Sequence, residues 1–199
     1  MAEYETILTA VDNGIGQITI NRPDARNALN TQVLGDIRQT LAEFRHDREV
    51  GVVVFTGAGE RAFAAGADIG ELRQRTALDA LASVMQDVYD EIEAYEKPTI
   101  AAVNGLALGG GCELAMACDV RVASGDARFG LPEVKRGLFA AGGGVFLSRR
   151  IPLANALSRR RSSVRLHTAR LAGVNRSSTV RPSSMVTSET MAWPPNRSW

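Results

Sequence analysis

The chain contains few cysteines, no long apolar run and no visible secretory signal, and each absence narrows the class of protein. Its 199 residues include two cysteines, Cys112 and Cys118, whose spacing fits neither a CxxC pair nor a metal-binding pattern. We expect both thiols to be reduced, as in cytoplasmic proteins. The longest apolar runs are far too short to span a bilayer, and the first residues show no basic and apolar regions of a signal peptide. The sequence therefore predicts a cytoplasmic protein with no membrane partner and no metal site.

Acidic residues are scarce in one part of the chain. Residues 149–199 contain ten arginines, no lysine and a single acid, whereas residues 1–148 contain 13 Lys and Arg against 21 Asp and Glu. The basic segment is also rich in Ser, Thr and Pro without periodic apolar residues, which is typical of poorly ordered chain. It lacks interleaved aromatic residues and a basic helical face, so we expect no nucleic-acid partner. We predict a core domain over residues 1–148 and an Arg/Ser-rich tail over 149–199.

Several well-known catalytic motifs are also missing. The chain has no GxSxG, HExxH or zinc spacing, and its three consecutive glycines, 109–111, fit neither GxGxxG nor GxxxxGK[ST]. His46 is predicted on the polar side of a helix and His167 lies in the tail, so neither has the neighbours of a catalytic base. These absences argue against nucleophilic-serine, zinc and dinucleotide sites.

Strand-like and helical patterns alternate over residues 1–148, which indicates an α/β fold. Asp12-Asn13-Gly14 between two apolar runs predicts a hairpin. Asn30 or Thr31 can cap a helix whose apolar residues recur at helical spacing. Strands are predicted at 4–11, 15–21, 51–56, 99–103 and 120–123, a second long helix between residues 78 and 95, a loop at 129–133, and a turn entering a helix at 138–147.

The stretch from residue 99 to residue 133 contains the densest set of chemical features. A predicted buried strand is followed by Gly109–Gly111 and by an apolar helix whose first turn contains Glu113. Glycines between a strand and a helix let backbone N–H groups face a ligand, and a helix N-terminus favours negative charge. A second carboxylate, Glu133, follows Pro132. Backbone donors beside two carboxylates are the groups that acid–base chemistry next to an oxyanion requires.

Four long segments occur in the order and spacing of one protein family: ITINRPDARNALN, FTGAGERAFAAGADIGEL, KPTIAAVNGLALGGGCELAMACDVRVAS and ARFGLPEVKRGL. With them, residues 1–148 resemble the enoyl-CoA hydratase/isomerase (crotonase) superfamily. The resemblance implies a spiral of ββα units, an acyl-CoA thioester substrate without a separate cofactor, and a homo-trimer or hexamer. It weakens after about residue 157, so we expect the family's C-terminal helical region to be truncated or replaced, with reduced activity and assembly.

The resemblance also implies roles for particular residues. The backbone N–H groups of Ala67 and Gly110 would form an oxyanion hole for the thioester oxygen. Glu113 would orient and deprotonate a water molecule, and Glu133 would deliver a proton to Cα. The implied CoA-binding positions are Arg26, Ala65, Gly66, Ala67, Asp68, Ile69 and Gly110, with Arg26 near the phosphates. Because both glutamates match, the resemblance favours a hydratase that adds water syn to a trans-2-enoyl-CoA and gives a 3-hydroxyacyl-CoA.

Other interpretations remain open from the sequence. Glu113 can be an ordinary acid in the first turn of a helix, and Asp68 a solvated charge at a helix start. Glu133 can be an exposed loop acid paired with Lys135 or Arg136. The alternative functions are an enoyl-CoA isomerase or another reaction of this superfamily, and an inactive truncated product that binds acyl-CoA.

Overall fold

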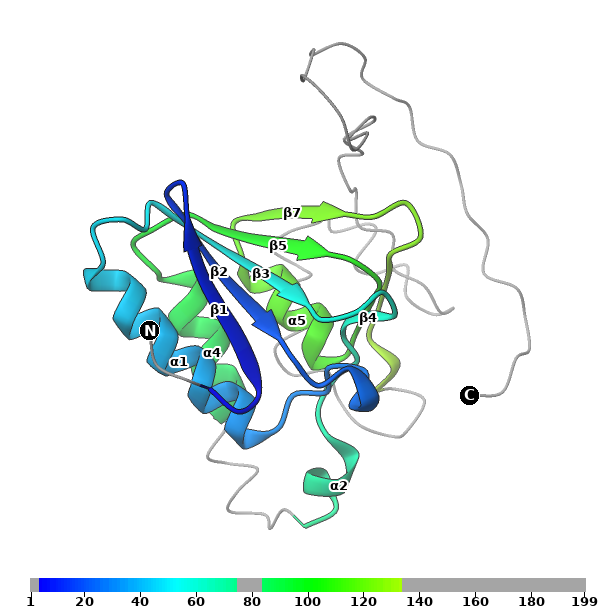
Figure 1. Ribbon diagram of the computed structural model, residues 1–199. Helices are drawn as coiled ribbons and strands as arrows, with labels where there is room; N and C mark the ends of the chain where they lie inside the picture. Colours follow the sequence, from blue (N-terminus) through cyan, green and yellow to red (C-terminus); the bar gives the residue numbers. More distant parts are fainter. Residues whose placement is uncertain (1–3, 75–83, 134–199) are drawn as a thin grey trace.

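The computed structural model describes residues 4–74 and 84–133 (Figure 1). The tail at 149–199, the predicted turn at 138–147 and the first part of the predicted helix between 78 and 95 lie outside the described residues. The described residues form two sheets and a layer of helices, and the way the chain alternates between them positions the candidate site.

The larger sheet has five strands in the order β1-β2-β3-β5-β7. The two first strands are antiparallel and the others join in parallel. Asn13 and Gly14 connect the antiparallel pair with φ values of 48° and 84°, the left-handed conformation that tight hairpins need, which confirms the predicted hairpin. The strands are β1 (Ile7–Asp12), β2 (Ile15–Ile20), β3 (Val52–Gly57), β5 (Thr99–Val103) and β7 (Val120–Ala123).

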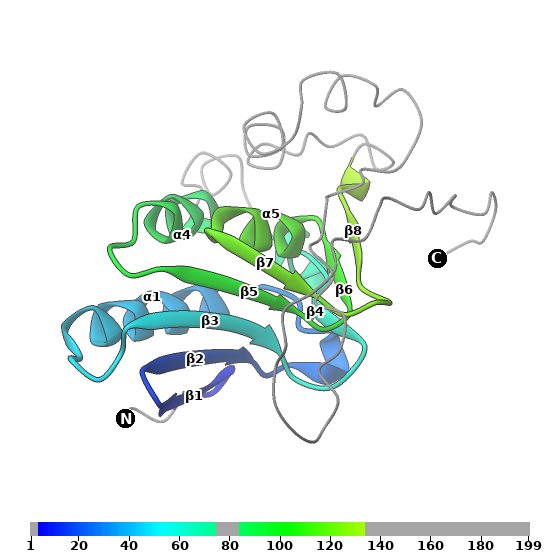
Figure 2. The same ribbon diagram turned by 90° about the horizontal axis from the view of Figure 1, so that it is seen from above.

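Three helices lie on one side of this sheet (Figures 1 and 2): α1 (Thr31–His46), α4 (Val84–Glu93) and α5 (Gly110–Ala117). The Asn30 side chain caps α1 by accepting a hydrogen bond from the Val33 N–H at 2.9 Å, as predicted. The apolar stripe of α1 is buried against the sheet, and every residue of α5 is buried. Because α5 has no solvent-exposed face, packing fixes the position of its first turn. None of the described helices is long and apolar enough to cross a membrane.

A second sheet contains three short parallel strands in the order β4-β6-β8. These are β4 (Ala62–Ala64), β6 (Leu106–Leu108) and β8 (Arg128–Gly130). The prediction of a loop at 129–133 is therefore wrong at Phe129 and Gly130, which belong to β8. A three-residue strand is too short to show a period of two, and it exists here because its backbone pairs with β6.

The chain passes from the large sheet to the small sheet and then to a helix in the turns β3, β4, α2 (Ile69–Leu72) and β5, β6, α5, and the two strands of this pattern recur as β7 and β8. This is the ββα spiral that the family resemblance implies. Because the three short strands are parallel, their carboxyl ends lie at one edge of the small sheet. The segments that follow them, 65–68, 109–110 and 131–133, are therefore brought together. A 3-10 turn, η1 (Pro23–Ala25), completes the description.

Candidate active site

The carboxyl edge of the small sheet brings the predicted site residues together. The Ala67 nitrogen, after β4, lies 3.7 Å from the position that a Cβ on Gly110 would occupy. Glu133, after β8, places its Oε1 atom 2.7 Å from the corresponding position on Gly109. The Gly109 N–H donates to the Gly130 carbonyl oxygen at 2.8 Å, so β8 is tied directly to the glycine turn. Parallel strands of one sheet present their loops at the same edge, which is where α/β proteins commonly bind ligands.

The peptide between Gly109 and Gly110 points an N–H group away from helix α5. The Gly109 carbonyl accepts the N–H groups of Cys112 and Glu113 at 2.8 and 3.0 Å. In a trans peptide the N–H and C=O point in opposite directions, so the Gly110 N–H faces away from these partners. Within residues 4–74 and 84–133, no acceptor is found for it. It is therefore a donor at the N-terminus of a buried helix, where the helix field favours an anion.

The peptide between Gly66 and Ala67 has a matching arrangement. The Gly66 carbonyl accepts the Leu29 N–H at 2.8 Å, and the Asp68 N–H donates to the Leu29 carbonyl at 2.9 Å. The Ala67 N–H points opposite to the Gly66 carbonyl and has no acceptor in the described part of the chain. Both peptides therefore have an N–H group without an acceptor among the described residues, and the Ala67 nitrogen lies 3.7 Å from the Cβ position of Gly110.

Glycine is required at position 111 by the close approach of β4 and at position 109 by backbone geometry. A Cβ on Gly111 would lie 1.9 Å from the Ala64 carbonyl oxygen, a distance that no side chain can adopt. Gly109 has φ +50° and ψ −125°, outside the ordinary left-handed basin of residues with a side chain. The glycine run therefore lets α5 begin directly against β4 and the Ala67 loop.

The two candidate carboxylates belong to different segments of the fold. Glu113 lies in the first turn of α5 and is 8% exposed. Glu133 is half-buried, and its Oε2 atom is shielded from solvent. The alternative of an exposed Glu133 therefore does not describe this structure, while Lys135 and Arg136 lie outside the described residues.

Tyr89 of α4 is part of the same cluster, and the sequence interpretation missed it. Its hydroxyl, on a side chain only 1% exposed, donates to the Gly110 carbonyl oxygen at 2.7 Å. Burial raises the pKa of Tyr89 well above its usual range, and the negative charges of Glu113 and Glu133 raise the pKa further, so the phenol remains a donor. The helical period puts Tyr89 on the buried face, four residues after Met85, but no sequence pattern identifies the carbonyl it contacts.

The predicted CoA-binding residues lie along the loop after β4 and the segment beside it. Arg26 is exposed, and its carbonyl oxygen accepts the Ala65 N–H at 3.1 Å. Ile69 is 47% exposed, which is unusual for an isoleucine adjacent to a buried turn. Gly66 is buried and Ala65 partly buried. These residues are contiguous with the two available N–H groups.

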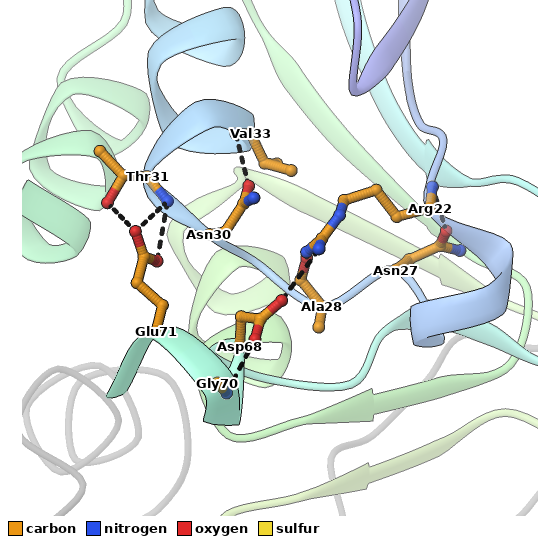
Figure 3. Close-up of polar contacts among 9 residues, drawn as sticks. All are labelled: Arg22, Asn27, Ala28, Asn30, Thr31, Val33, Asp68, Gly70 and Glu71. Atoms are coloured by element: carbon orange, nitrogen blue, oxygen red, sulfur yellow. Dashed lines mark hydrogen bonds and ion pairs between the residues drawn. The ribbon is translucent and has the colours of Figure 1, made fainter. Parts of the chain in front are cut away.

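Asp68 is engaged with protein groups. Its Oδ2 atom forms an ion pair with Arg22 at 2.9 Å, and its Oδ1 atom accepts the Gly70 N–H at 2.9 Å and so caps α2 (Figure 3). The hydrogen bond from Arg22 lowers the pKa of Asp68, with a further contribution from the Gly70 N–H. The description of Asp68 as merely a solvated charge is therefore incomplete. Among the described residues, no group of three or more His, Cys, Asp or Glu side chains could hold a metal ion.

Comparison with known proteins identifies the family. The sequence profile of the enoyl-CoA hydratase/isomerase family matches residues 10–193. A probable enoyl-CoA hydratase, echA8, of Mycobacterium tuberculosis is 46% identical over 155 residues, which cover 77% of this chain and 60% of that protein. A short-chain-enoyl-CoA hydratase of Clostridium acetobutylicum is 44% identical over 145 residues, covering 72% of this chain and 56% of that protein.

A solved enoyl-CoA hydratase subunit I from Geobacillus kaustophilus superposes with a TM-score of 0.73 at 40% sequence identity, covering 79% of this chain and 61% of that chain. The chain thus spans about 60% of the length of the relatives it matches. Since the family profile matches most of the sequence and the crotonase-type spiral is present, the chain belongs to the enoyl-CoA hydratase/isomerase family.

Proposed function

We propose that this chain carries the catalytic centre of an enoyl-CoA hydratase, which adds water syn across the double bond of a trans-2-enoyl-CoA and gives a 3-hydroxyacyl-CoA. One observation supports the proposal above the others. The Ala67 nitrogen lies near the start of α5, the helix that contains Glu113, and Glu133 Oε1 lies near Gly109, while the Gly66 and Gly109 carbonyl oxygens, which share peptide groups with the Ala67 and Gly110 N–H groups, accept hydrogen bonds from other residues.

In this mechanism the thioester oxygen accepts both N–H groups. Attack of water at Cβ moves electrons from the double bond onto that oxygen, and the two donors stabilise the developing negative charge. Removing one donor of this kind typically costs roughly 3–4 kcal/mol of transition-state stabilisation. The fixed peptides of Ala67 and Gly110 need little reorganisation as the charge develops, because their carbonyl oxygens are already bound by Leu29 and by the first turn of α5.

The two glutamates handle the protons. Glu113, in the field of the α5 N-terminus that stabilises negative charge, acts as the carboxylate that takes a proton from the attacking water. Glu133, whose Oε1 atom lies near Gly109, donates a proton to Cα as the enolate collapses. The product therefore gains OH at Cβ and H at Cα, and a proton passes from Glu113 to restore Glu133. We assign Arg26 to the CoA phosphates, and its exposure beside Ala65 supports this role.

The test is hydration of crotonyl-CoA by the full chain, followed as loss of the ultraviolet absorbance of the conjugated thioester. Glu113→Gln and Glu133→Gln should each lower kcat by about 10²- to 10⁴-fold, the range for removal of a general acid or base. Glu60→Gln, at an exposed glutamate outside the cluster, is the matched control and should leave kcat unchanged.

Two results separate the alternatives. An isomerase would convert a 3-enoyl-CoA and would depend mainly on one of the two glutamates, whereas hydration requires both. A chain that is folded by circular dichroism and yet hydrates no enoyl-CoA would overturn the proposal, as would full activity in either glutamine variant.

A further inference from the structure

Arg22 stands at the head of a chain of hydrogen-bonded peptides that ends at the Ala67 N–H. Its Nη1 atom donates to the Ala28 carbonyl at 2.7 Å. The same peptide unit contains the Leu29 N–H, which donates to the Gly66 carbonyl at 2.8 Å. That second peptide unit contains the Ala67 N–H. The guanidinium is therefore connected to the Ala67 N–H through two peptide groups, each of which accepts a hydrogen bond at its carbonyl oxygen.

Such a chain acts on its last donor in two ways. Each hydrogen bond fixes the plane of the next peptide, because the N–H and C=O of a trans peptide are rigidly opposed. Each hydrogen bond also polarises the next peptide, and condensed-phase estimates put this strengthening at roughly 10–30% per bond. A permanent positive charge at the start orients and polarises the whole series in the sense that makes the Ala67 N–H a better donor.

Arg22 itself is held firmly. Its Nη2 atom forms an ion pair with Asp68 at 2.9 Å, while Nη1 donates to the Ala28 carbonyl oxygen (Figure 3). The guanidinium thus binds both the segment that contains Ala28 and the residue that follows Ala67. Its backbone N–H donates to the Asn27 Oδ1 atom at 3.0 Å. The buried Asn27 amide donates in turn to the carbonyl oxygens of Ala58 and Ala62. The charge at the head of the chain is thus fixed in position relative to β4.

We propose that Arg22 is a positioning residue that orients and polarises the Ala67 N–H through the two intervening peptides, with Asp68 holding the guanidinium in place. The inference rests on the proposed function, since it assigns Arg22 a role in binding the thioester oxygen. It also assigns Asp68 an action through Arg22, as opposed to direct contact with CoA. The Glu71 carboxylate lies outside this network, since it accepts hydrogen bonds from Thr31 at the start of α1 (Figure 3).

The test combines kinetics with a spectroscopic probe of the bound thioester carbonyl, which a loss of global stability alone does not shift. Butyryl-CoA, which has no double bond to hydrate, is bound with an isotope-labelled thioester carbonyl, and the carbonyl stretch is measured by infrared difference spectroscopy. In Arg22→Met the shift of this stretch on binding should be smaller than in the wild type. For hydration of crotonyl-CoA, kcat should fall about tenfold with KM within about threefold, less than the loss expected for removing a donor outright. Arg22→Lys keeps the positive charge but loses the planar, two-pronged guanidinium. Its carbonyl shift and its kcat should therefore lie between those of the wild type and those of Arg22→Met.

Two further variants make the result specific. Asp68→Asn should lower kcat in the wild type but have little added effect in Arg22→Met, because Asp68 acts through Arg22. Glu71→Gln is the matched control, and it should lower the unfolding temperature without changing the carbonyl shift or kcat.

The inference is overturned if Arg22→Met keeps the wild-type carbonyl frequency and kcat, or if Asp68→Asn raises KM equally in both backgrounds. In either case the proposed function stands, provided that the wild type hydrates crotonyl-CoA. A folded wild type with neither hydration nor a carbonyl shift overturns both.

Discussion

The two N–H groups at the site are the same chemical group, but different parts of the molecule hold them. The Ala67 peptide is fixed by Leu29 of a neighbouring segment, with the Arg22–Asp68 ion pair behind it on a partly exposed surface. The Gly110 peptide is fixed by the first turn of α5 itself, in fully buried backbone. The orientation of the Ala67 N–H therefore depends on a charged side-chain pair. The orientation of the Gly110 N–H depends on a run of glycines that have no side chains. Substitutions and pH should affect the two in different ways.

The largest loss of stability is expected at Gly111, where the buried backbone of β4 leaves no room for a side chain. In Gly111→Ala the new methyl group meets the Ala64 carbonyl oxygen at 1.9 Å, so either β4 or α5 must move. We expect a loss of about 3 kcal/mol or more in the free energy of unfolding, at the upper end for overpacking, together with loss of hydration activity. Denaturant unfolding measures the first quantity.

Gly35→Ala is the matched control for this change. Gly35 lies within α1, and a Cβ there meets nothing within 4 Å. Alanine should therefore stabilise the helix by about 0.5–1 kcal/mol. A Gly111→Ala protein as stable as the wild type would show that the contact between β4 and α5 is looser than described.

A smaller effect is expected at Tyr89. Tyr89→Phe removes the hydroxyl that donates to the Gly110 carbonyl, with a cost of about 1 kcal/mol in the free energy of unfolding. Because this bond holds the first turn of α5, kcat for hydration should fall as well. Tyr95→Phe also removes a buried hydroxyl from a carbonyl oxygen, that of Leu41 in α1, and should destabilise without changing kcat. Equal kcat values for the two variants would contradict a role for Tyr89 at the site.

The smallest expected effect is the pH dependence of folding stability that comes from the Arg22–Asp68 ion pair next to Ala67. Since Arg22 lowers the pKa of folded Asp68 below its ordinary value of 3.8, the pair stabilises the fold above that value, and this contribution is lost as pH falls through the folded pKa. For a partly exposed ion pair we expect at most about 1 kcal/mol. The stability difference between the wild type and Asp68→Asn should therefore be largest near neutral pH and shrink in acid. A constant difference would mean that the pair does not titrate in this way.

The sequence could predict the contacts that depend on local structure, and it could not by itself predict those between distant segments. Glu113 and Gly110 are three residues apart on a strand–glycine–helix pattern, so their proximity follows from local structure alone. The hairpin at Asn13 and the cap at Asn30 are equally local. Family resemblance was needed to place Ala67 and Glu133 with them, because those residues meet only through the parallel pairing of β4, β6 and β8.

Three-residue strands have no readable period, and this is why the small sheet was not predicted. The sequence did not predict roles for Arg22 and Tyr89 for a related reason. Each acts by bonding to a backbone carbonyl of a distant segment, Ala28 in one case and Gly110 in the other. A backbone acceptor leaves no trace in the identity of the residue that carries it, so only the folded chain reveals such partners.

The most direct test of the central claim is the infrared spectrum of the labelled thioester carbonyl of butyryl-CoA bound to the wild-type chain. If the N–H groups of Ala67 and Gly110 both bind the oxygen, the stretch should move to lower frequency on binding than in water, since two fixed donors polarise the C=O bond more than solvent does. A bound thioester whose carbonyl stretch stays at or above its frequency in water would contradict the account.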